Sequence, residues 1–100
     1  MGHSLKTQMF LIETRMADAA MGDIQALYEL GVAYSTGTGG VDTDFIEAHK
    51  WFNLAALNGS TAAQECRADI AEDMTAREIA EAQRQARARL ADMADTRRAA

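Results

Sequence analysis

The sequence predicts an all-α fold of about five helices arranged as antiparallel hairpins, and three observations support this. The chain of 100 residues has no proline and is rich in alanine, and both features favour helices. Apolar residues recur at steps of three and four, as on one face of a helix. Valine, isoleucine, threonine and aromatic residues do not alternate with polar residues over any run of six, so strands are not expected.

Residues 5–20 are expected to form the first helix, with Ser4 as its cap. Gly22 is expected to end this helix, because glycine adopts the left-handed conformation at little cost. The apolar residues that recur in it at steps of three and four are Leu5, Met9, Ile12, Met16 and Ala19 or Ala20.

Asp23 is expected to begin the second helix, with its carboxylate at the positive end of the helix dipole. Gly31 lies beside the packed face, where the missing side chain lets another helix approach closely. The residues predicted to share the packed face are Ala26, Leu27, Leu30, Ala33 and Tyr34. Those predicted to point the other way are Gln25, Tyr28, Glu29, Val32 and Ser35.

The glycine-rich segment 37–40 breaks this helix, and Asp42, Thr43 or Asp44 caps the third, with Asp44 the preferred choice. Asn58 and Gly59 end it. Large rings alternate with small alanines on its predicted packed face, a pattern that fills the space between helices: Phe45, Ala48, Trp51, Phe52, Ala55 and Ala56.

A fourth helix is expected over residues 60–73, with a stripe of Ala63, Cys66 and Ile70. Thr75 and Glu78 form a capping box that starts a fifth helix, which is expected to fray near residues 95–100. The stripe predicted for this last helix comprises Ile79, Ala82 or Gln83, Ala86, Leu90 and Met93.

Charge and composition narrow the classes of function. The net charge of −5 argues against binding nucleic acid or anionic membranes through the molecule as a whole. No apolar run reaches the roughly 20 residues of a membrane-spanning helix, and Cys66 is the only cysteine, so no intrachain disulfide is expected. A cytoplasmic location is expected, or a periplasmic one if a leader was removed.

The chain partly repeats itself at a shift of 37 residues. Gly22 corresponds to Gly59, and Ala26 corresponds to Ala63. Leu30 and Tyr34 would correspond to arginine and alanine, so the second copy is degenerate. A period of this length is typical of stacked helical hairpins.

Fifteen residues then match a known pattern at the correct spacing: Gly22, Ala26, Leu30, Gly31, Tyr34, Gly37, Gly39, Val41, Asp44, Ala48, Trp51, Ala55, Ala56, Gly59 and Ala63. The chain resembles the Sel-one-like repeat family, relatives of the tetratricopeptide repeats, as a short bacterial member with a single clear repeat. Gly40 is an extra residue in the turn. The resemblance implies a short right-handed α-α superhelix that acts as a protein-binding adaptor or scaffold.

One helical-repeat domain is expected over residues 1–100. Residues 1–4 are interpreted as a tag or a disordered start, and 5–20 as an N-terminal helix. Residues 22–59 are the core repeat, and 60–95 a degenerate second repeat with a capping helix. The structural residues expected to define the repeat are Gly22, Ala26, Leu30, Gly31, Tyr34, Trp51, Phe52 and Gly59.

Tyr28 and Val32 are the candidate anchors for a bound peptide, because they lie opposite the packed face of the second helix. In the related repeats this helix lines a concave surface. A simpler interpretation stays open, in which the first or fourth helix covers both side chains. The candidate partner-binding set is Gln25, Tyr28, Glu29, Val32, Glu65 and Asp69. A homodimer through the first or fifth helix is a further hypothesis.

No catalytic residue, cofactor or metal site is expected, and the chain is not expected to be an enzyme. Asp42, Asp44, Glu47 and His49 have metal-ligand side chains, but His49 points away from the others, so caps and solvated charges are the better interpretation. The alternative function is binding of nucleic acid or an acidic partner through the arginine-rich fifth helix, including Arg84 and Arg87.

Overall fold

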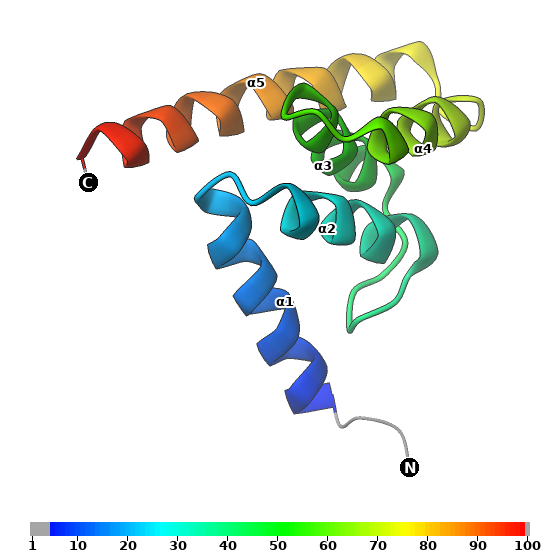
Figure 1. The fold of residues 1–100 in the computed structure, drawn as a ribbon. Helices are drawn as coiled ribbons and strands as arrows, with labels where there is room; N and C mark the ends of the chain where they lie inside the picture. Colours follow the sequence, from blue (N-terminus) through cyan, green and yellow to red (C-terminus); the bar gives the residue numbers. More distant parts are fainter. Residues whose placement is uncertain (1–4, 100) are drawn as a thin grey trace.

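The computed structural model describes the backbone of residues 5–99 and the side chains of residues 9–95. Its five helices are α1 (Leu5–Ala20), α2 (Ile24–Thr36), α3 (Phe45–Leu57), α4 (Thr61–Ala71) and α5 (Ala76–Ala99). This part of the chain contains no strand. The predicted all-α helical-repeat fold is therefore confirmed (Figure 1).

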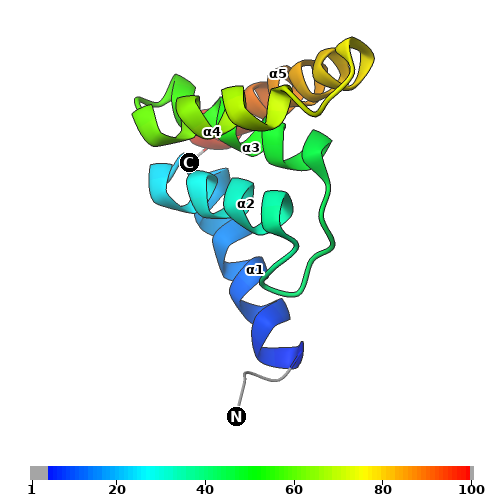
Figure 2. The same ribbon diagram turned by 90° about the vertical axis from the view of Figure 1, so that its right-hand side faces the viewer.

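Helix α3 lies at the centre of the molecule and packs against α2, α4 and α5. Helix α1 packs against α2 and extends away from the rest of the fold, as Figures 1 and 2 both show. The long α5 runs across α3 on the side opposite α2 (Figure 1). Within the described residues, none of the helices combines the length and the apolar composition that a membrane span requires.

Helices α2 to α5 begin with the same capping interaction. The side-chain oxygen of the cap accepts a hydrogen bond from the backbone N–H three residues later, which satisfies one free donor of the first turn. The caps and their donor distances are Asp23 with Ala26 (2.8 Å), Asp44 with Glu47 (3.1 Å), Ser60 with Ala63 (3.1 Å) and Thr75 with Glu78 (3.1 Å). The Glu78 carboxylate accepts from the Thr75 N–H at 2.8 Å, which completes the predicted capping box.

The predicted helix ends need two corrections. Helix α4 stops at Ala71 rather than 73, because the N–H groups of Glu72 and Asp73 turn back to carbonyls three residues earlier. Helix α5 continues through Ala99 instead of fraying near 95. The expected cap Ser4 lies outside the described residues.

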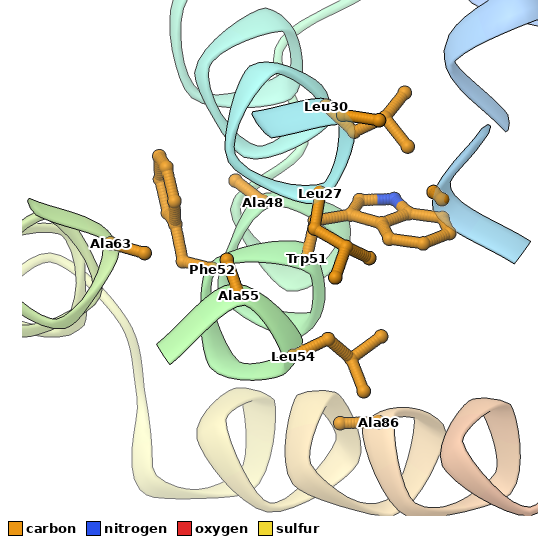
Figure 3. Close-up of a cluster of buried hydrophobic side chains, with 11 residues drawn as sticks. Leu27, Leu30, Ala48, Trp51, Phe52, Leu54, Ala55, Ala63 and Ala86 are labelled. Atoms are coloured by element: carbon orange, nitrogen blue, oxygen red, sulfur yellow. The ribbon is translucent and has the colours of Figure 1, made fainter. Parts of the chain in front are cut away.

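The buried cluster joins α2 and α3 to the other helices, and most of its members were expected. Leu54 was not predicted, yet it is fully buried and points toward Ala86 of α5 (Figure 3). Phe52 points toward Ala63 of α4 in the same view. Leu90 was expected on the packed stripe of α5 but is exposed, and Ala82 rather than Gln83 is buried there.

Gly31 allows α2 and α3 to lie close together, as predicted. A Cβ atom at this position would overlap the Phe52 ring, so the ring lies directly against the backbone of α2. Gly22 and Gly59 have φ angles of 85° and 104°, the left-handed conformation that glycine adopts at little cost. Each lies directly before a capping residue, so the two turns that precede α2 and α4 are built alike.

Candidate partner-binding groove

An open groove of about 520 Å³ lies between α1, α2 and the glycine-rich turn. Helix α1 provides Leu11 and Arg15. Helix α2 provides Tyr28, Glu29, Val32 and Ala33, and the turn provides Thr38 and Gly39. Three of the six predicted partner-binding residues, Tyr28, Glu29 and Val32, thus line one groove.

Tyr28 and Val32 are half-buried. They are therefore neither fully exposed, as peptide anchors would be, nor fully covered by a neighbouring helix. The Tyr28 ring contacts Phe52 in a tilted arrangement, with ring centroids 5.8 Å apart. Cys66 of α4 raises the pKa of Tyr28 above its usual value of 10.0, mainly by an electrostatic interaction, and burial adds to the effect. Neighbouring helices therefore hold Tyr28 in place, while part of its side chain faces the groove.

An ion pair fixes one wall of the groove. Arg15 Nε donates to Glu29 Oε2 at 2.8 Å, and it links α1 to α2. Gln25 Nε2 donates to the other carboxylate oxygen of Glu29 at 3.0 Å. A half-exposed pair of this kind adds little stability, but it fixes the orientation of both side chains. Gln25 itself is exposed and supports Glu29 without lining the groove.

The glycine-rich turn closes one end of the groove. The Asp44 N–H donates to the Tyr34 carbonyl at 2.8 Å, and this bond draws the two ends of the turn together. A Cβ atom at Gly39 would lie 3.7 Å from Arg15 Nη1 and 3.8 Å from Ile12 Cδ1, so the turn lies against α1. The sequence did not predict Leu11, Arg15, Thr38 or Gly39 as site residues, because only the packing of α1 and the turn brings them to α2.

Glu65 and Asp69, the other two predicted residues, lie outside the groove on the exposed side of α4. The 37-residue shift places them at the positions that Tyr28 and Val32 occupy on α2. The described chain shows no ion pair for either carboxylate.

The cluster of metal-ligand side chains around α3 has other roles. Asp44 caps α3, and Glu47 accepts bonds from Lys50 Nζ at 2.7 Å and from Trp51 Nε1 at 3.1 Å. His49 is only 4% exposed, and burial, with a smaller contribution from Arg67, lowers its pKa below 6.5. No three His, Cys, Asp or Glu side chains converge on a common point within the described residues.

The arginines of α5 do not form a continuous basic face. Arg84 pairs with Glu81 at 2.6 Å, and this hydrogen bond, together with one from Gln85, lowers the pKa of Glu81 to about 2. The Arg89 guanidinium lies over the Trp51 ring at 5.4 Å from its centroid. Two of the arginines that α5 would use to bind nucleic acid are therefore engaged in contacts within the protein.

The comparisons with known proteins agree with the geometry of the central hairpin. Residues 24–60 match the family model described as the Sel1 repeat, which covers α2, the turn and α3. No match was found among the curated proteins or among the solved structures.

Proposed function

Because residues 24–60 of this chain are a Sel1 repeat, we propose that the domain is a non-catalytic adaptor or scaffold that binds a peptide or a partner helix. Sel1 repeats generally act as protein-interaction modules. The groove between α1, α2 and the turn is the proposed binding surface. The observation that carries this proposal is the position of Tyr28 and Val32. Both side chains pack against the buried cluster and also line the open groove.

The groove has the properties of a peptide site. Its floor is apolar and rigidly supported, because Val32 and Ala33 belong to a helix that packs on the core. Polar groups lie at its edge, where Glu29, Arg15 and the Thr38 hydroxyl can orient a backbone or a side chain. Apolar anchors surrounded by a few fixed polar groups are typical of binding hot spots.

Selection from a random dodecapeptide library displayed on phage tests the proposal. Peptides selected on the wild-type protein should lose binding to Leu11→Asp, which places a charge in the groove. Leu90→Asp is the matched control, because both leucines lie within helices and are similarly exposed, at 38% and 43%. Failure to select any peptide, or equal binding to both variants, would contradict the proposal.

Self-association through α1 is a second candidate, favoured by the apolar surface of this helix. Phe10 is 65% exposed, and Met9 and Leu11 beside it are also exposed. A second hollow of about 220 Å³ lies on another side of α1, next to Val41 of the turn. The ridge formed by Phe10 and these hollows would suit a symmetric contact between two copies.

Sedimentation velocity over a range of concentrations tests this second candidate. The wild type should form dimers as the concentration rises, and Phe10→Asp should remain monomeric. Leu57→Asp is the control, since Leu57 is equally exposed, at 63%, but lies at the end of α3. A wild type that stays monomeric at the highest concentration would exclude the dimer.

The arginine-rich α5 receives less support as a nucleic-acid surface. Among the arginines of α5 whose side chains the structure describes, Arg84 is bound to Glu81 and Arg89 lies against Trp51, whereas Arg77 and Arg87 are exposed. Binding by this helix would fall steeply with salt and would disappear in Arg84→Glu/Arg87→Glu.

A further inference from the structure

We infer that the partner of this groove is a basic peptide segment. One apolar side chain of the peptide enters the groove between α1 and α2, and a Lys or Arg about three residues away lies against Glu65 and Asp69 of α4. This inference rests on the proposed function and deepens it, because it gives the chemistry of the partner.

The first step is that α2 and α4 present equivalent faces. Asp23 and Ser60 cap the two helices in the same way, each after a glycine with positive φ. The two helices run in the same direction in Figures 1 and 2, and residues of α2 contact residues of α4. Glu65 and Asp69 follow Tyr28 and Val32 by 37 residues, so they occupy on α4 the face that Tyr28 and Val32 occupy on α2.

The second step is that these two faces are joined. Tyr28 of α2 packs against the Phe52 ring, and Cys66 of α4 packs against the same buried cluster, so the exposed side of α2 lies next to the part of α4 that carries Glu65. Asp69 follows Cys66 by three residues, almost one helical turn, so it lies on the same side of α4. A peptide that leaves the groove across Tyr28 consequently reaches these two carboxylates.

The third step is the charge balance. Residues 22–73 carry nine Asp and Glu but only Lys50 and Arg67 as strong bases. Lys50 is bound to Glu47, and Arg67 donates to Asn53, so both cations are engaged by residues of α3. Within the described residues no basic side chain forms an ion pair with Glu65 or Asp69. The exposed carboxylates of Glu65 and Asp69 therefore favour a basic partner and disfavour an acidic one.

The spacing within the peptide follows from helix geometry. The axes of packed helices lie about 8–10 Å apart, and an extended peptide advances about 3.3 Å per residue. Passing from α2 to α4 therefore requires about three residues.

Two pools of synthetic dodecapeptides provide the probe. Every peptide in both pools carries a leucine at one fixed position. The two positions three residues before and three residues after this leucine are lysine in one pool and glutamate in the other. In titrations followed by fluorescence anisotropy at low salt, the lysine pool should bind the wild type about three- to tenfold more tightly. The difference should shrink as salt is added, because the carboxylates are exposed.

A charge-reversal variant locates the effect. Glu65→Lys/Asp69→Lys should lose the preference for lysine or reverse it. Asp42→Lys/Asp73→Lys is the matched control, since it changes the net charge equally at exposed positions outside the helices, and it should keep the preference.

The outcomes separate this inference from the proposed function. If both pools bind equally and Leu11→Asp abolishes binding, the groove is the peptide-binding site, but the inference of a basic partner is wrong. If the control variant loses the preference as fully as Glu65→Lys/Asp69→Lys, net charge rather than this face is responsible, and the inference is also wrong. If neither pool binds, both proposals fail.

Discussion

The close contact between α2 and α3 at Gly31 depends on a single missing side chain. Gly31 brings the backbone of α2 against the Phe52 ring, and the same ring supports Tyr28 at the groove. Core packing and the candidate binding surface therefore share one aromatic residue. A larger side chain at position 31 should therefore disturb both the core packing and the groove.

Gly31→Ala should destabilise the domain although alanine favours helices. The helix preference gains about 1 kcal/mol, whereas forcing a methyl group into a packed core costs about 1–3 kcal/mol. Since the new Cβ would overlap a buried ring, we expect a cost near the upper end of this range and a net loss of up to about 2 kcal/mol in urea denaturation. In the Phe52→Leu background the loss should be smaller. An unchanged loss in that double mutant would show that the ring is not the cause.

Trp51→Ala should cost about 3–5 kcal/mol, a large share of a typical total of about 5–15 kcal/mol. The indole fills the space between α3 and its neighbours, and its Nε1 donates to Glu47. Lys50 and Arg89 also lie against the ring, so the substitution would leave their cations without this contact. Circular dichroism and solubility are the measurements, and a fully folded variant of unchanged stability would contradict the assignment.

His49 should make stability depend on pH near neutrality. Burial lowers its pKa in the folded state below 6.5, so below that pH the unfolded chain binds a proton that the folded chain does not. The contribution of neutral His49 to the free energy of unfolding is complete above pH 6.5, and it is lost as the pH falls toward the lowered pKa.

Melting temperatures between about pH 7.5 and 5.5 test this prediction. The wild type should lose stability over this range, and His49→Gln should show a flatter profile. His3→Gln, which removes the other histidine, should retain the wild-type slope. A His49→Gln profile as steep as that of the wild type would assign the pH dependence to other groups.

At the scale of the elements, the N-caps set where each of α2 to α5 begins. Asp23, Asp44, Ser60 and Thr75 make one kind of bond to the third N–H of their helices. This regularity places α2 and α4 in equivalent positions relative to their turns, which is why the two faces used in the proposals correspond.

Asp44→Ala should lower stability by about 1 kcal/mol, because an N–H of the first turn loses its acceptor. Asp42→Ala is the control, since this nearby carboxylate is exposed and caps nothing. Urea denaturation of both variants distinguishes the cap from a general charge effect. Equal losses would indicate that Asp42 shares the capping role.

At the scale of the whole molecule, stability should be unequal along the chain. Helix α3 is surrounded by α2, α4 and α5, whereas α1 packs against α2 and projects from the fold (Figure 2). Hydrogen exchange should therefore be slowest in α3 and fastest in the N-terminal part of α1, because local opening of α1 breaks fewer contacts. Exchange in α1 as slow as in α3 would show that another contact, such as a second copy of the chain, protects it.

The fold class, the order of the helices and the residues at which they begin can be predicted from the amino-acid sequence, because these depend on local chemistry. Caps, glycines and the spacing of apolar residues act within one or two helical turns. Asp44 and the capping box of Thr75 and Glu78 are examples. Likewise, Gly31 was correctly predicted to allow a close approach, although its contact with Phe52 was not specified.

The residues that form the groove could not be predicted from the sequence, because they come together only when the helices pack. Leu11 and Arg15 lie on α1, far in sequence from Thr38 and Gly39, and no local pattern relates the two pairs. Leu54 was missed and Leu90 misplaced for a similar reason: the orientation of α5 across α3 determines which side of each helix is covered. Periodicity shows that a helix has an apolar face, whereas packing between distant segments determines what covers that face and what remains open to a partner.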